Sequence, residues 1–188
     1  MKKRFSVFIN NKIKKFNKII NVEGDKSISH RALLIASQCI GISNIKNVLE
    51  GEDVGNTISC LKKLGIKIEK KDEKYIIYGN GLGGLRKPKN NFLYAGNSGT
   101  LARMLIALLA TQDNFKTKIA GDNSLNKRDM KRIIDPLSKI GCNFYPKNKT
   151  TLPLIIEGTS MPLAQKHLET IGSAQVKSAI LLAALNTP

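Results

Sequence analysis

An internal repeat constrains the fold of this chain more than any other feature of its sequence. Residues 24–36 (GDKSISHRALLIA) place a glycine turn, hydroxyl groups and basic side chains before an apolar run, and residues 96–110 and 172–185 repeat this order. A basic residue within the run recurs after 72 positions and then after 74. A period of this length indicates one supersecondary unit that is used several times.

Each stretch has the pattern of a buried helix that follows a polar turn. Glycine permits the turn, and we expect Ser27 or Ser29 to cap the first helix. The free N–H groups and the positive dipole end of such a terminus, together with Lys26 and Arg31, suit a phosphate or a carboxylate. A single stretch could equally be a capped core helix with solvated cations. Three such termini are more easily explained if they converge on one anionic ligand.

A second amphipathic segment follows each of the first two stretches. Residues 52–68 and 126–144 both have the pattern of a helix, a Leu-Gly or Ile-Gly stop and a short strand, and the stop glycines lie 76 positions apart. The order strand, helix, strand, helix, strand, strand predicts an α/β fold of the α+β type, built of repeated βαβαββ units.

The predicted domain boundaries follow this repeat. Residues 21–188 are expected to form one domain with units at about 21–84, 85–158 and 159–188, the last of them incomplete. A repeat that needs its neighbours for burial should not end half-way, so we expect the chain to be a fragment of a longer protein. Residues 1–20 are predicted to form two strands that belong to a second domain.

Apolar periodicity and turn residues place the individual elements. Helices are predicted over residues 27–38, 54–64, 100–111 and 128–140 and from residue 175; strands are predicted over 41–48, 66–70, 74–78, 116–120, 142–146, 152–157 and 163–169. The glycine-rich link 79–84 has a GxGxxG-like spacing but no strand-to-helix crossover, so we do not expect a dinucleotide site there.

The net charge of +17 raises the question of an anionic partner. A basic nucleic-acid-binding domain is one possibility. However, 25 of the 31 basic residues are lysines, and they are spread along the chain and do not form one basic segment. The same charge would steer small substrates that carry several anionic groups.

No segment indicates secretion, a membrane span or a metal site. The apolar runs are far shorter than a membrane span, and the run after the basic N-terminus is too short for a signal peptide. Cys39, Cys60 and Cys142 lack metal-ligand spacing and are expected to be small core residues. We therefore expect a cytoplasmic protein.

Four collinear motifs resemble one enzyme family. GDKSISHR, GNSGTLAR, GDNSLNKRDM and GSAQVKSAILLAAL, in this order and spacing, are similar to the 3-phosphoshikimate 1-carboxyvinyltransferases, or EPSP synthases. The resemblance covers residues 22–188. It implies the inside-out α/β barrel of the enolpyruvyl transferases, in which the enolpyruvyl group of phosphoenolpyruvate passes to the 5-hydroxyl of shikimate 3-phosphate and phosphate leaves.

The resemblance implies roles for particular residues. Lys26 is expected to contact both substrates and to help move a proton at the reacting hydroxyl, which a crowded lysine can do. The expected shikimate 3-phosphate site comprises Lys26, Ser27, Arg31, Ser173, Ala174 and Gln175.

The expected phosphoenolpyruvate site shares two of these residues, Lys26 and Gln175. Gly99 should lie against the ligand, and Arg128 should bind it through a planar fork that lysine replaces poorly. The resemblance implies no metal or organic cofactor, no nucleic-acid or membrane partner, and a monomer at full length. Asn97 and Arg103 are expected as supporting residues, although Arg103 could equally be a structural cation.

Two positions bear on how typical the chain is of the family. The family usually has Arg-Pro-Met where this chain has Arg128, Asp129 and Met130. The SAQVKSA and GEDVxNT motifs resemble the glyphosate-tolerant class, but tolerant members carry alanine at the position of Gly99. The glycine leaves room for glyphosate, so we expect a sensitive enzyme.

The family's proton-transfer carboxylates lie beyond this chain, which alone should be inactive.

Some alternatives stay open at this stage. The related UDP-N-acetylglucosamine enolpyruvyl transferases share the chemistry, but their motif has asparagine after the lysine, where this chain has Ser27. Asp53 and Asp122 are interpreted as loop caps in preference to site residues. His30 is expected on the surface of its helix and not as a catalyst.

Overall fold

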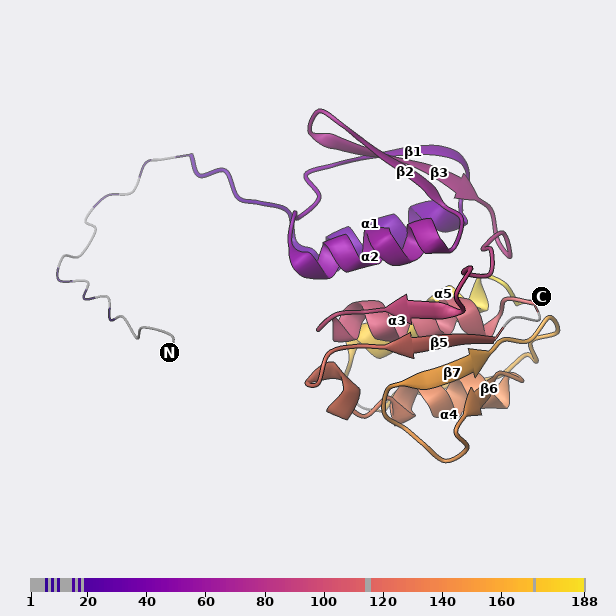
Figure 1. Ribbon diagram of the computed structural model, residues 1–188. Helices are drawn as coiled ribbons and strands as arrows, with labels where there is room; N and C mark the ends of the chain where they lie inside the picture. The colour runs from indigo at the N-terminus through magenta and orange to yellow at the C-terminus, as the bar shows by residue number, and fades with distance from the viewer. Residues whose placement is uncertain are drawn as a thin grey trace.

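The computed structural model describes residues 19–113, 116–170 and 172–187, together with Ser6, Phe8, Asn10, Lys15 and Asn17. Three consecutive units are visible along the chain (Figure 1). The first contains α1 (Lys26–Gln38), β1 (Ile40–Lys46), α2 (Glu52–Lys63), β2 (Lys67–Lys71) and β3 (Lys74–Asn80). The second contains β4 (Phe92–Tyr94), α3 (Gly99–Ala110), β5 (Lys116–Ala120), the 3-10 helix η1 (Leu125–Lys127), α4 (Lys131–Lys139), β6 (Asn143–Tyr145) and β7 (Leu154–Glu157). The third contributes α5 (Ala174–Ala184).

The two sheets share one connectivity. The first has the order β1-β3-β2 and is antiparallel. The second has the order β4-β5-β7-β6, in which β5, β7 and β6 correspond to β1, β3 and β2, and β4 pairs parallel to β5 at the edge. The predicted α/β repeat is therefore confirmed, and β4 is the first strand of the second βαβαββ unit, for which no residue range was predicted.

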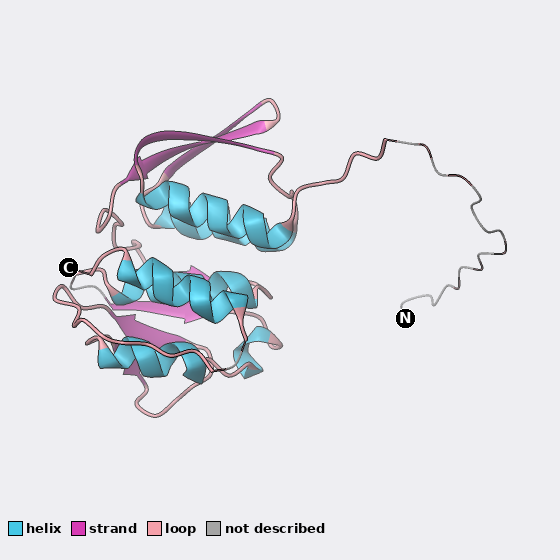
Figure 2. Cartoon of the chain, turned by 180° about the vertical axis from the view of Figure 1, so that it is seen from behind, coloured by secondary structure: helices cyan, strands magenta, loops and turns pink. Residues whose placement is uncertain are grey.

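Helices α1 and α2 of the first unit face α3 and α5, and the sheet of the first unit covers the outer side of α1 and α2 (Figures 1 and 2). Helix α3 lies at the centre, where every residue except Arg103 is buried. The core is built from leucine, isoleucine, valine and alanine with few aromatic side chains, as the composition predicts. In the part of the chain that the structure describes, no helix has the length and apolar character needed to cross a bilayer.

The third unit departs from the prediction. The strand expected over residues 163–169 does not form: this segment is irregular, and it pairs with no strand. Leu163 and Leu168 are exposed, and the N–H of Leu163 donates to the carbonyl of Ile140 beyond the end of α4. The apolar residues of this segment do not alternate with polar ones, and no strand among the described residues supplies it with backbone hydrogen bonds.

The helix predicted over residues 128–140 begins later than expected. The chain first forms η1 and then runs extended through Arg128, whose φ is −78° and ψ is 134°. The N–H of Met130 bonds to the carbonyl of Thr150, and the Asp129 side chain accepts from the N–H of Lys131 at the start of α4. Arg128 therefore lies on a link and not on the helix.

Two further expectations fail or fall outside the described residues. Much of the predicted N-terminal hairpin is not described; Ile19, Ile20 and Val22, which are, belong to no strand and are exposed. Cys39 is exposed at the end of α1, whereas Cys60 and Cys142 lie in the core as predicted. Burial raises the pKa of the Cys60 thiol to about 11.

Candidate functional site

The start of α1 is organised by an aspartate. The side chain of Asp25 accepts a hydrogen bond from the N–H of Ile28 at 2.7 Å and caps the helix, so the prediction of Ser27 or Ser29 as the cap was wrong. Ser29 instead donates to the Asp25 carbonyl and accepts from the N–H of Leu49. It thereby fixes the loop after β1 against the helix terminus.

Lys26, the first residue of α1, reaches across to α2. Its Nζ lies 2.9 Å from Oδ2 of Asp53, and the lysine side chain is 52% exposed. An ammonium has three N–H donors, so one carboxylate partner leaves two for an incoming anion. Asp53 is thus the partner of Lys26, a role that differs from the loop cap we expected.

The start of α3 brings two guanidinium groups against a glycine. Ser98 caps the helix through the N–H of Leu101, and Gly99 is its first, buried residue. A Cβ added to Gly99 would lie 2.8 Å from Nη1 of Arg103 and 3.2 Å from Nη1 of Arg128. Both cations therefore lie directly beside a helix N-terminus, an arrangement that attracts anions.

Arg128 is held from the loop that precedes α3. Its Nη2 donates to Oδ1 of Asn97 at 2.9 Å, and the Asn97 amide in turn donates to Asp122. Asp122 also accepts from the N–H of Leu125 at 2.7 Å, so it acts as a cap in the loop that precedes η1, as predicted. These two hydrogen bonds lower the pKa of the Asp122 carboxyl, which stays ionised.

The start of α5 is tied to α3 through Gln175. Ser173 caps α5 through the N–H of Val176. Gln175 accepts from Nη1 of Arg103 at 2.9 Å and donates through Nε2 to Oγ1 of Thr100 at 2.8 Å. Both ends of this amide are therefore fixed.

Arg103 is the most enclosed cation of this group. Beside Gln175, it donates to the carbonyls of Gly99 and Asp129 at 3.3 and 3.4 Å. Burial, and then the positive charge of Arg128, lowers the pKa of its guanidinium. A guanidinium titrates so far above neutral pH that Arg103 remains charged. Its hydrogen bonds connect α3 with α5 and with the link before α4, which agrees with the expectation of a supporting residue.

Each pair of the three helix termini is joined by side-chain hydrogen bonds. Between α1 and α3, His30 contacts Ser98 at 3.2 Å. Between α1 and α5, Arg31 donates from Nε to Ser178 at 2.9 Å and from Nη2 to the carbonyl of Ala174 at 3.3 Å. The bonds of Gln175 close the third side. The three termini therefore lie together in the structure, whereas their binding of one anionic ligand stays a prediction.

All eight predicted site residues take part in this arrangement, although their roles toward substrates stay predictions. They are Lys26, Ser27, Arg31, Gly99, Arg128, Ser173, Ala174 and Gln175. Ser27 takes part through its carbonyl, which accepts from Nη1 of Arg31 at 3.0 Å.

Sequence reasoning missed two members of the group and misplaced a third. Thr100 and Thr57 lie within the GNSGTLAR and GEDVxNT motifs but were given no role, because a threonine inside a helix carries no local signal of its partners. His30, expected on the surface, is completely buried. Burial lowers its pKa from 6.5 to about 4.

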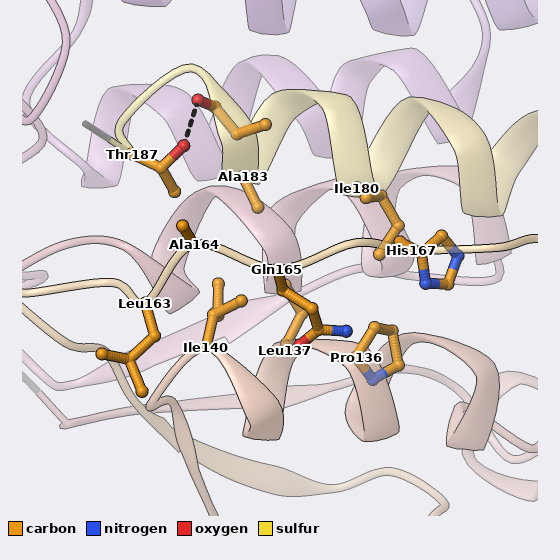
Figure 3. A pocket seen from close by; sticks show the side chains of 11 residues that line it. Pro136, Leu137, Ile140, Leu163, Ala164, Gln165, His167, Ile180, Ala183 and Thr187 are labelled. Atoms are coloured by element: carbon orange, nitrogen blue, oxygen red, sulfur yellow. Dashed lines mark hydrogen bonds between the residues drawn. The ribbon is translucent and has the colours of Figure 1, made fainter.

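A small cavity of about 80 Å³ lies away from these cations (Figure 3). It is enclosed by α4, α5 and residues 163–167, and its walls are mainly apolar, with Leu137, Ile140 and Ile180 among them. At its edge the hydroxyl of Thr187 donates to the carbonyl of Ala184. None of the predicted site residues lines this cavity. The helix termini, which carry N–H donors and cations, therefore suit a small anionic ligand better than this apolar cavity does.

Comparison with known proteins identifies the family. The family model described as EPSP synthase (3-phosphoshikimate 1-carboxyvinyltransferase) matches residues 10–188. The chain belongs to the EPSP synthase family. A solved EPSP synthase from Acinetobacter baumannii has 38% sequence identity and superposes with a TM-score of 0.81, over 88% of this chain and 37% of that one.

Curated EPSP synthases show the same relation. The 3-phosphoshikimate 1-carboxyvinyltransferase of Paramagnetospirillum magneticum is 46% identical over 167 residues, which are 88% of this chain and 37% of the relative. That of Alkaliphilus metalliredigens is 46% identical over 180 residues, or 95% of this chain and 42% of the relative. The chain thus spans about two fifths of the length of these EPSP synthases.

Proposed function

We propose that this chain supplies the N-terminal half of the active site of a 3-phosphoshikimate 1-carboxyvinyltransferase. In that reaction the hydroxyl at C5 of shikimate 3-phosphate gives up its proton and its oxygen bonds to C2 of phosphoenolpyruvate, while the methylene carbon of phosphoenolpyruvate takes up a proton. Loss of phosphate and of a proton from the tetrahedral intermediate then gives 5-enolpyruvylshikimate 3-phosphate. The observation that carries the proposal is the convergence of three capped helix termini with Lys26, Arg31 and Arg128.

The junction of α1 and α5 suits shikimate 3-phosphate. Arg31 already spans this junction through Ser178 and Ala174, so its guanidinium is oriented before a ligand arrives. Lys26 adds an ammonium at the same helix terminus, next to free backbone N–H groups. A phosphate gains most from donors that need no reorganisation.

The start of α3 suits phosphoenolpyruvate. The carboxylate and the phosphate of phosphoenolpyruvate need cations at close range. Because Gly99 has no side chain, the guanidinium groups of Arg103 and Arg128 can approach the helix terminus. Arg128 offers a planar fork whose orientation Asn97 fixes. The fixed amide of Gln175 lies between the two proposed sites.

The same proposal covers the partners. The enzyme would act as a monomer in the cytoplasm on small molecules, without nucleic acid, metal or organic cofactor. Transfer to UDP-N-acetylglucosamine is not favoured, because the relatives at 43–46% identity are named 3-phosphoshikimate 1-carboxyvinyltransferase.

Calorimetric titration of shikimate 3-phosphate into the full-length natural protein, without and with glyphosate, tests the proposal. We expect saturable binding that is lost in Lys26→Ala and Arg31→Ala. Lys139→Ala, which removes the same charge from the far end of α4, should bind normally. Absent binding, or salt-sensitive binding of duplex DNA in its place, would overturn the proposal.

A further inference from the structure

His30 occupies a buried position between three helices. It lies on α1 with no exposed surface. Its Nδ1 is 2.6 Å from Oγ1 of Thr57 on α2, and its Nε2 is 3.2 Å from Oγ of Ser98, the cap of α3. Both ring nitrogens therefore have a hydroxyl partner, one on each neighbouring helix.

The hydroxyl groups determine where the ring carries its proton. Ser98 accepts from the N–H of Leu101 and can donate its own hydrogen to Nε2. Nδ1 then holds the proton and donates to Thr57, whose hydroxyl donates in turn to the carbonyl of Asp53 at 3.4 Å. With the proton on Nε2 instead, the Ser98 hydrogen would have no acceptor among the contacts of the described residues.

This chain of hydrogen bonds ends at both parts of the candidate site. At one end is Asp53, whose carboxylate holds Lys26. At the other is Ser98, which precedes Gly99 and caps the terminus that Arg103 and Arg128 approach. The charged groups that act on the ring are Asp53 on α2 and Lys26 and Arg31 on its own helix.

We propose that His30, neutral and protonated on Nδ1, is a positioning residue that holds the Lys26 side of the site at a fixed spacing from the Gly99 side. It does not touch a substrate. It acts through Thr57 on α2 and through Ser98 on α3. The kinetic consequence rests on the proposed transferase function, whereas the state of the ring does not.

Nitrogen-15 NMR of the histidine rings in the full-length natural protein tests the ring state directly. We expect His30 to show a neutral ring with a protonated, slowly exchanging Nδ1, and His167, which is exposed, provides the reference signal. A proton on Nε2, or a doubly protonated ring at about pH 6, would overturn the inference.

Variants that break one link at a time test the positioning role. The amide of an asparagine can replace Nδ1 as a donor to Thr57 but cannot reach Ser98. We therefore expect His30→Asn to raise KM for phosphoenolpyruvate about tenfold, with kcat and KM for shikimate 3-phosphate changed less than about twofold. The matched control His167→Asn should change none of these values.

A second pair of variants keeps the test decisive if His30→Asn folds poorly. Thr57→Val preserves shape but removes the acceptor for Nδ1, whereas Thr57→Ser keeps the hydroxyl. We expect Thr57→Val to raise KM for shikimate 3-phosphate about tenfold through the Lys26 side, and Thr57→Ser to restore it. Equal losses for both substrates, or no loss, would mean that His30 only fills the core.

The two proposals fail in different ways. If the unaltered protein does not consume phosphoenolpyruvate, the transferase proposal fails, and the NMR signature still decides the ring state. If the unaltered protein is active but His30→Asn and Thr57→Val have unchanged or uniformly altered kinetics, the positioning inference alone fails.

Discussion

Arg103 donates from Nη1 to Oε1 of Gln175 at 2.9 Å, across the junction of α3 and α5. The other end of the same amide donates to Thr100 at 2.8 Å. Arg103 therefore uses one of its N–H donors to fix the neutral side chain of Gln175, which is proposed to face both substrates. Its place in the site depends on its geometry as well as its charge.

Replacing Arg103 by lysine should show this dependence on geometry. A lysine keeps the charge but cannot bond to Gln175 and to the carbonyls of Gly99 and Asp129 together. We expect the free energy of unfolding to fall by about 1–2 kcal/mol and phosphoenolpyruvate affinity to fall about tenfold. Urea denaturation and titration measure the two effects. Arg86→Lys, at an exposed position, is the control, and an equal loss there would contradict the prediction.

Gly99→Ala should separate ligand binding from stability. The new Cβ would meet the guanidinium ends of Arg103 and Arg128 at 2.8 and 3.2 Å, and these side chains can move aside. We expect an unchanged fold, but affinities for phosphoenolpyruvate and glyphosate that are each weakened about tenfold, because both need the displaced cations.

Inhibition curves measure this effect. The unaltered full-length natural protein should be glyphosate-sensitive, so full activity at high glyphosate would contradict that expectation. Gly55→Ala on α2, where the added carbon meets open space, is the matched control. A Gly99→Ala curve that overlays the unaltered one would rule out the proposed approach of the ligand.

His30 makes stability depend on pH. Burial lowers its pKa from 6.5 to about 4, so the unfolded chain binds this proton more readily than the folded one. Above pH 6.5 neutral His30 does not reduce the free energy of unfolding. As the pH falls towards 4, the free energy of unfolding falls by up to about 3 kcal/mol, because only the unfolded chain takes up this proton. Denaturation series at several pH values should show the loss. His30→Asn should reduce the slope of the free energy of unfolding against pH between pH 6.5 and 4. An unchanged slope in the variant would contradict the assignment.

Asp53→Asn should affect function more than stability. The Lys26–Asp53 pair is partly exposed, so its loss should cost less than about 1 kcal/mol. The ammonium would lose its orientation, and we expect kcat/KM to fall about tenfold or more. Asp135→Asn, which breaks the exposed pair with Lys131 on α4, is the matched control. Equal kinetic effects of the two variants would show that only bulk charge matters.

The fold could be predicted where local pattern and burial agree. The strand β5 lies over residues 116–120 as predicted. Its side chains alternate between buried and exposed positions, and its backbone pairs with a neighbouring strand on either side. The segment 163–169 was predicted as a strand although its apolar residues do not alternate, and it has no strand beside it in the described structure. His30 was misjudged because its partners Thr57 and Ser98 are 27 and 68 positions away.

The basic residues of the repeat do not occupy equivalent positions in the three helices. Arg31, Arg103 and Lys177 are spaced by 72 and 74 residues, but the helices begin at Lys26, Gly99 and Ala174, which are 73 and 75 apart. Arg31 is thus the sixth residue of α1 and reaches α5, whereas Arg103 is the fifth of α3 and bonds back to Gly99. Sequence spacing identified the convergence of the helices but not which cation bridges which pair.

The hydrogen bonds among the three helix termini exist only in the folded chain, so an anion that bound between these termini would favour folding. Positive dipole ends and cations that meet at one point repel one another, and a bound polyanion relieves this repulsion. A ligand that binds only the folded chain raises the free energy of unfolding by about 2.7 kcal/mol when its concentration is one hundred times its Kd. The melting temperature would then report metabolite concentration, and supply of the substrate would set how long the protein survives proteolysis.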